Sequence, residues 1–220
     1  MRYWIASAVI ALTTAGVLTG CADGSGGLPD AGLMMRDAAI SAGAIGSAHV
    51  VLQAQGTVPG FPLRTLDADV SKKDGGSATG AATLPSGSVT RFVAAQGKVF
   101  SKSDKGTLVP MPAGFPSPSA MIGRDGGLAQ LLRSLRDPET VGREEFTGVD
   151  AFKIEAVVPA SALASILPGT TRDATLTVWV RVRGAHLPLQ TVLGFPDHPD
   201  AHLTVTVSKS QSASVPGIES

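Results

Sequence analysis

The chain has 220 residues, with 18 Lys and Arg against 18 Asp and Glu, and a single cysteine. With neither an excess nor a run of positive charge, it lacks the electrostatic signature of a nucleic-acid-binding protein. Only 16% of the residues are charged, below the usual quarter. A weakly charged, aliphatic chain must bury much apolar surface. Because it has one cysteine, it can form no disulfide within the chain. Its stability therefore depends on its core.

The N-terminal segment has the layout of a bacterial lipoprotein signal. Arg2 supplies a positive charge, residues 3–19 are an uncharged core, and small residues close it. The run Leu-Thr-Gly-Cys that ends at Cys21 matches a lipobox, whose small residues let a peptidase reach the bond before the cysteine. A membrane span fits less well because the apolar run of 17 residues is short. A secretory signal with an incidental thiol is the other alternative.

Cleavage before Cys21 divides the chain into four predicted parts. Residues 1–20 are the signal peptide, residues 21–29 an acylated N-terminus and flexible tether, residues 30–208 a single domain, and residues 209–220 a polar tail. Each buried methylene contributes about 0.8 kcal/mol. The diacylglycerol on Cys21 is therefore expected to hold the protein on the extracytoplasmic side of the cell membrane, whether or not a third acyl chain is added.

A helix is predicted from Asp30 to Ile45, where apolar residues recur at helical spacing. From Ser47 the period changes to two, and turn residues interrupt it repeatedly. This pattern predicts strands over residues 47–55, 65–70, 78–84, 89–95 and 98–102. Because the strands follow one another through short turns, they form an antiparallel meander.

The middle of the chain mixes the two periods. Residues 110–118 hold four prolines and are predicted to form an irregular loop, followed by a helix over residues 128–135 that Asp137-Pro138 ends. Strands are predicted over residues 141–144 and 150–158. A third short helix after Pro159 is expected to stop at Pro168-Gly169.

The C-terminal third predicts three more strands, over residues 175–182, 187–193 and 202–207. Roughly nine strands against three helices, without regular alternation, favour an antiparallel sheet. One face of such a sheet must be covered. The sheet either packs on itself as a sandwich or barrel, or it leaves an apolar cavity that three short helices do not fill. The pattern alone leaves both open.

Five short stretches carry a family resemblance over essentially the whole mature chain. They are SAHVVL at residues 47–52, RFV at 91–93, GKVF at 97–100, GLAQLL at 127–132 and TVWV at 177–180. Together they resemble the LppX/LprA/LprF/LprG family of actinobacterial lipoproteins. The resemblance implies an α+β fold: a curved antiparallel half-barrel of the LolA/LolB type, with a few helices on its concave face enclosing an apolar cavity.

The resemblance also implies a function. The protein is expected to bind acyl chains of cell-envelope lipids or glycolipids and to carry or present them, without catalysis, cofactor or metal. Its expected partners are these lipids, the membrane through Cys21, and a membrane lipid exporter. The chain departs from its relatives at residues 121–125 and 198–200, which leaves the choice of lipid open. Motion of residues 110–127 is expected to gate entry.

Acyl chains offer nothing to hydrogen-bond, so the residues predicted to line the cavity are aliphatic. A chain of about 16 methylenes costs on the order of 13 kcal/mol to expose to water, which a carrier avoids. On the helix side the predicted lining residues are Leu128, Leu131, Leu132 and Leu135. On the sheet they are Val50, Leu52, Leu66, Val70, Val93, Val178, Val180 and Leu189.

Two other functions remain as alternatives: an anchored envelope hydrolase acting on lipid esters or glycans, and a structural, partner-binding lipoprotein with no cavity. The sequence has no Gly-x-Ser-x-Gly elbow. His198 and His202 would converge on a metal only in a helix, whereas Pro199 indicates a turn entering a strand. His49 alternates with apolar residues and is interpreted as a hydrogen-bonded structural histidine. Trp179 is interpreted as a packing residue rather than part of a cavity rim.

Overall fold

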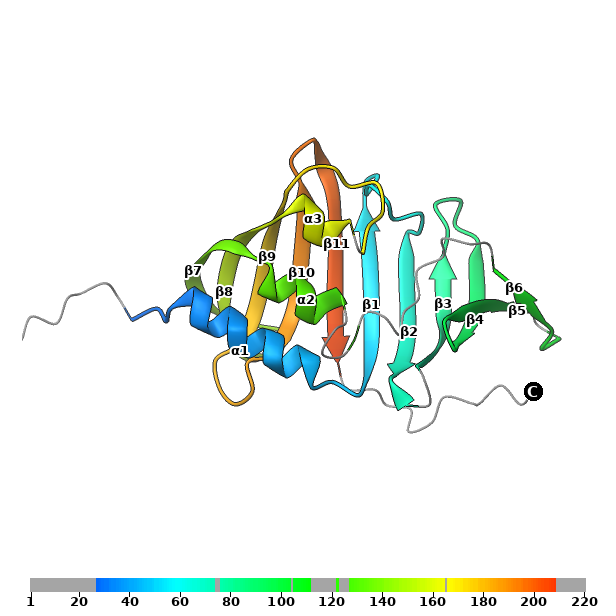
Figure 1. Ribbon diagram of the computed structural model, residues 1–220, viewed down its shortest axis with the longest axis horizontal. Helices are drawn as coiled ribbons and strands as arrows, with labels where there is room; N and C mark the ends of the chain where they lie inside the picture. Colours follow the sequence, from blue (N-terminus) through cyan, green and yellow to red (C-terminus); the bar gives the residue numbers. More distant parts are fainter. Residues whose placement is uncertain are drawn as a thin grey trace, which may run out of the picture.

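A computed structural model describes residues 27–73, 76–103, 105–111, 122, 127–164 and 166–208 (Figure 1). Its body is one antiparallel sheet of eleven strands. The first six are β1 (Ser47–Gln55), β2 (Thr65–Ser71), β3 (Ser77–Thr83), β4 (Val89–Ala95), β5 (Lys98–Lys102) and β6 (Leu108–Pro110). The others are β7 (Arg136–Phe146), β8 (Val149–Val158), β9 (Ala174–Arg181), β10 (Pro188–Phe195) and β11 (His198–Ser208).

The first and the last strand in sequence, β1 and β11, pair with each other at the middle of the sheet. It runs β6-β5-β4-β3-β2-β1-β11-β10-β9-β8-β7, so every neighbour is also a neighbour in sequence except β1 and β11. The hairpin between β4 and β5 has a two-residue turn, Gln96-Gly97. Gln96 and Gly97 both have positive φ, 51° and 75°, as a two-residue hairpin turn requires. The predicted antiparallel meander is confirmed.

Three helices lie on one face of the sheet, which we call the inner face (Figure 1). They are α1 (Ala31–Gly43), α2 (Gly127–Arg133) and α3 (Ala160–Leu163). The Asp30 carboxylate accepts the Leu33 N–H at 2.7 Å and so caps the start of α1. With one open sheet covered by helices, the sandwich alternative is wrong and the α+β half-barrel class is confirmed.

Alternation along the strands separates the inner face from the outer face. In β1, Ala48, Val50 and Leu52 are buried, and the register places Leu52 between Leu66 of β2 and Val205 of β11. The intervening position His49 lies opposite Asp69 on the outer face. The apolar core therefore fills the space between the inner face and the helices.

The sheet differs from the prediction at its two edges. β6 was missed because it has only three residues and ends at a proline. β7 begins at Arg136, so Asp137-Pro138 lies inside a strand and does not simply follow a helix end. Asp137 has a φ of 48° and the register shifts between Arg136 and Glu139. Such a bulge at an edge strand tolerates proline. Most of the predicted 110–118 loop lies outside the described residues.

Gly80 of β3 allows the backbone of β2 to approach closely. It pairs with Ala68 of β2 and Phe92 of β4, and a Cβ at this position would meet the backbone of β2, 2.7 Å from the Cα of Ala68. Because backbone cannot rotate away, we expect Gly80→Ala to lower the free energy of unfolding by about 3 kcal/mol in urea titration. Gly142→Ala in β7, where nothing lies within 4 Å, is the control and should cost under about 0.5 kcal/mol. Equal losses would contradict this account.

Candidate functional site

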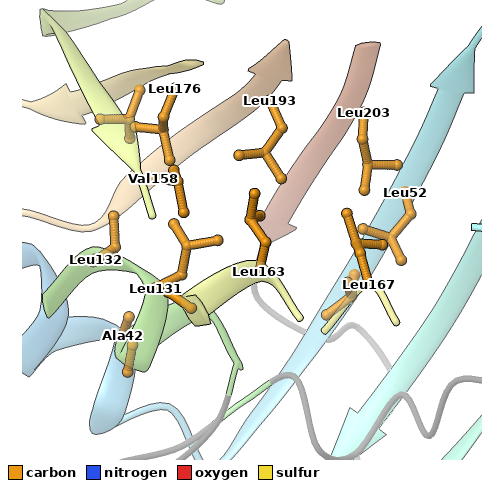
Figure 2. Close-up of a cluster of buried hydrophobic side chains, with 14 of the residues drawn as sticks. Ala42, Leu52, Leu131, Leu132, Val158, Leu163, Leu167, Leu176, Leu193 and Leu203 are labelled. Atoms are coloured by element: carbon orange, nitrogen blue, oxygen red, sulfur yellow. The ribbon is translucent and has the colours of Figure 1, made fainter. Parts of the chain in front are cut away.

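An apolar cavity lies between the centre of the sheet and the layer formed by α2 and the segment that follows α3. Figure 2 shows Leu131, Leu163 and Leu167 pointing toward sheet leucines. The cavity is lined from the sheet by Leu52, Thr191, Leu193, Leu203 and Val205, and from the other side by Phe61, Gly127, Leu128, Leu131, Ile166 and Leu167. Among these described lining residues, Thr191 alone has a polar side chain. Such a surface favours a hydrocarbon occupant.

The cavity is small in this arrangement. It holds about 50 Å³, whereas a cavity of about 150 Å³ is needed to take up benzene. An acyl chain needs more space than this cavity offers. α2 and α3 have seven and four residues, and helices this short depend on packing rather than on their own propensity. The helix layer is therefore held against the sheet by its apolar contacts.

Two larger hollows are open and have charged or amide side chains in their linings. One holds about 620 Å³ on the outer face and includes Asp67, Asp69, Arg91 and Lys102 among its lining residues. The other holds about 570 Å³ beside the connection between β1 and β2, where Gln53, Gln55 and Arg64 contribute. Their charged and amide groups would lose hydration against a hydrocarbon chain. The small apolar cavity is therefore the candidate acyl site, despite its size.

Asp173 ties α3 to the edge of the sheet. Its carboxylate accepts the backbone N–H of Ala160, the first residue of α3, at 2.8 Å, and pairs with Arg136 of β7. The Ala160 hydrogen bond holds the pKa of the Asp173 carboxyl below its ordinary value, and Arg136 lowers this pKa further. Since α3 leads into Ile166 and Leu167, this contact helps to fix one wall of the cavity.

A lowered pKa makes the contribution of Asp173 depend on pH. Its stabilising effect is present above the ordinary carboxyl pKa and is lost as pH falls through the lower folded-state pKa. We expect Asp173→Asn to be less stable than wild type near neutral pH, with the difference shrinking below about pH 4. Thermal unfolding at several pH values measures this. A difference that stays constant down to about pH 2 would contradict it.

Three of the predicted lining residues do line the cavity: Leu52, Leu128 and Leu131. Others belong to the same apolar core but do not line the cavity. These are Val50, Leu66, Val70, Leu132, Val178 and Val180, all buried, and Leu135, which is half-buried and packs against the core.

Two predicted residues lie elsewhere. Val93 alternates with buried Phe92 and Ala94 in β4, so it lies on the outer face, and Phe92 occupies the inner position. Leu189 lies where the β10 register shifts between Pro188 and Gln190, half-buried and outside the apolar core. The placement of Val93 on the cavity side was therefore wrong, and Leu189 does not line the cavity.

Several lining residues were not among those predicted. Leu193, Leu203 and Val205 alternate in strands that the sequence did predict, so their period of two was the available signal. Phe61 lies outside the strands, in a segment without periodicity, so no sequence pattern could place it at the cavity. Ile166 lies within the stretch predicted as the third helix, but α3 ends at Leu163 and Ile166 follows it.

The polar residues considered as catalytic or metal-binding candidates lie on the outer face or near the strand ends. His49 Nδ1 lies 3.3 Å from Asp69 and its Nε2 lies 3.6 Å from Asp67, in agreement with a hydrogen-bonded structural histidine. Trp179 stacks on Phe146 at 4.9 Å between ring centroids and is absent from the cavity lining. In the described ranges no group of three His, Cys, Asp or Glu side chains is placed to hold a metal.

Within the part of the chain that the structure describes, every helix is too short or too polar to cross a bilayer. The predicted signal segment and Cys21 lie outside the described residues.

Comparisons with known proteins agree with this architecture. The LppX_LprAFG lipoprotein family matches residues 30–214. Over 193 residues the chain is 32% identical to the lipoarabinomannan carrier protein LprG of Mycobacterium tuberculosis, covering 80% of this chain and 79% of that protein. Identity to LprG of Mycolicibacterium smegmatis is 28% over 212 residues, covering 90% and 89%.

Two solved structures share the fold. LprF of Mycobacterium bovis aligns with a TM-score of 0.74 at 21% identity, covering 86% of this chain and 97% of LprF. LppX of Mycobacterium tuberculosis aligns with a TM-score of 0.64 at 21% identity, covering 80% of this chain and 92% of LppX. The open antiparallel sheet with few helices is thus shared with both proteins.

Proposed function

Because the chain belongs to the LppX/LprA/LprF/LprG family of lipoproteins, we propose that it is a membrane-anchored lipid carrier. It binds the acyl chains of cell-envelope glycolipids between the inner face of the sheet and the α2–α3 layer. The observation that carries this proposal is the lining of the cavity, which is aliphatic or aromatic apart from Gly127 and the hydroxyl of Thr191. The name of LprG, a lipoarabinomannan carrier, supports a glycolipid cargo.

The energetics favour an opening helix layer. When α2 and α3 move from the sheet, Leu131 and Leu167 lose contacts with strand residues such as Leu203. An entering acyl chain replaces these contacts, so the total buried apolar area is retained. Each methylene that leaves water gains about 0.8 kcal/mol. Exposing the acyl chain to water costs the same free energy. A cavity that opens only around a bound acyl chain limits this exposure.

The carrier is held by acylated Cys21 on the extracytoplasmic face of the cell membrane, where a membrane lipid exporter is its expected further partner. It works without catalysis. A hydrolase would need serine, histidine and acid groups converging on the bound lipid. His49, with Asp67 and Asp69, instead lies on the outer face, across the sheet from the apolar cavity.

Mass spectrometry of co-purifying lipids tests the proposed function. The protein is produced in an actinobacterial host from a gene whose Cys21 codon is changed to serine behind a secretory signal, so that its own acyl chains do not confuse the analysis. We expect acylated glycolipids to remain bound through detergent washing, at close to one lipid per protein. Recovery of no lipid from correctly folded protein would contradict the proposal, and would favour the structural alternative.

A further inference from the structure

Helix α1 carries large apolar side chains on both its buried and its exposed side. Met34, Ala38 and Ala42 are buried against the core, as expected for a helix that covers a sheet. On the other side, Leu33 is 58% exposed and Ile40 is 67% exposed. Eight large apolar side chains of the described residues are exposed, and three of them, Leu28, Leu33 and Ile40, fall within thirteen positions of the chain. Two of the four exposed side chains of α1 are thus large and apolar, where a surface helix ordinarily carries polar ones.

Leu33 and Ile40 lie on the same side of α1. They are seven residues apart, which is close to two helical turns, so their side chains leave the same side of the helix about 10 Å apart. Arg36 and Asp37 lie between them, and Asp37 Oδ2 is 3.5 Å from His186 Nδ1. The charges on this side are therefore of both signs, and its distinctive property is its apolar area.

The short segment between Cys21 and α1 limits how far this side of the helix can lie from the membrane. The cap of α1, Asp30, follows Cys21 by nine residues. Even a fully extended chain of nine residues spans only about 30 Å. If Cys21 is acylated, the bilayer always lies within this reach of the start of α1. No other apolar phase is held so close to Leu33 and Ile40.

We propose that the outer side of α1, through Leu33 and Ile40, rests in the interface of the bilayer that anchors Cys21. This inference rests on the anchor in the proposed function and adds an orientation to it. Because α1 packs against α2, and α2 lines the cavity through Leu128 and Leu131, membrane contact brings the opening layer next to the lipid source. An acyl chain then travels a shorter path through water.

A fluorescence experiment on the full acylated protein tests this contact. Since Cys21 is the one cysteine of the chain and is consumed by acylation, Ile40→Cys supplies a single thiol for an environment-sensitive fluorophore. Val89→Cys is the matched control, because Val89 is 65% exposed, close to the 67% of Ile40, but lies in β4. Both proteins are reconstituted into phosphatidylcholine vesicles that contain a spin-labelled lipid.

We expect the lipid quencher to reduce fluorescence at residue 40 at least threefold more than at residue 89, and Leu33→Ser in the labelled protein to diminish that difference. Equal quenching at the two positions overturns the proposal, as does quenching at residue 40 that Leu33→Ser leaves unchanged. The lipid content of the protein, measured separately, distinguishes this failure from failure of the carrier function: a protein that retains glycolipid but shows equal quenching is a carrier that docks differently.

Discussion

Replacing Val205 with tryptophan is expected to reduce the lipid that co-purifies with the protein at least tenfold. Val205 lies on β11, is half-buried and lines the apolar cavity. An indole in place of an isopropyl group fills the about 50 Å³ available there and stays in the space that an acyl chain would need after α2 and α3 open. Mass spectrometry of the purified protein, normalised to protein amount, measures the loss.

Val207→Trp is the control for this experiment. Val207 is two positions along the same strand, on the same face, and is also half-buried against the core, but it does not line the cavity. Overpacking costs typically 1–3 kcal/mol at either site, so both variants should unfold at similar urea concentrations. Val207→Trp should retain its lipid. Equal lipid loss in the two variants would show that destabilisation, not occupation of the cavity, is responsible.

Cys21→Ala is expected to abolish incorporation of a fatty-acid label completely. The thioether to diacylglycerol requires the Cys21 sulfur, and no other cysteine is present to replace it. Cells grown with an alkyne-tagged fatty acid should label the wild-type protein and not the variant. Without the thiol the lipoprotein peptidase also has no substrate, so the variant should keep residues 1–20 and a correspondingly larger mass.

Ala22→Ser provides a control for altered processing, since it changes the residue after the cysteine and keeps the thiol. It should be labelled and cleaved as wild type. Label that persists in Cys21→Ala, or an unlabelled wild-type protein, would support the secretory-signal alternative and remove the basis for the membrane orientation of α1.

The fold was predictable where local chemistry and periodicity agree. The bounds of β4 and β5 follow from alternating residues on each side of Gln96-Gly97, whose backbone can adopt the turn. α1 follows from the Asp30 cap and helical spacing. β6 and the first half of β7 were missed because both are exposed edges, where no buried face imposes a period of two.

The candidate site was predictable only in part. In β4 the neighbours Phe92 and Val93 are both apolar, so the pattern did not decide which of them faces inward. Leu52, Leu128 and Leu131 were found because strand and helix periods mark their faces. Phe61 reaches the cavity through the path of an irregular segment, which depends on tertiary packing and leaves no periodic signal. The proposal of a glycolipid cargo came from family resemblance and not from any residue pattern.

Photo-crosslinking of a glycolipid with a diazirine in its acyl chain tests most directly whether lipid binds beneath α2 and α3. The protein is loaded with this lipid, irradiated and digested, and the modified residues are located by mass spectrometry. The account predicts adducts on the cavity side, at Leu52, Leu131, Leu203 and Val205. Adducts confined to the outer face, around Val93 and Trp179, would contradict it, as would a folded protein that takes up no lipid.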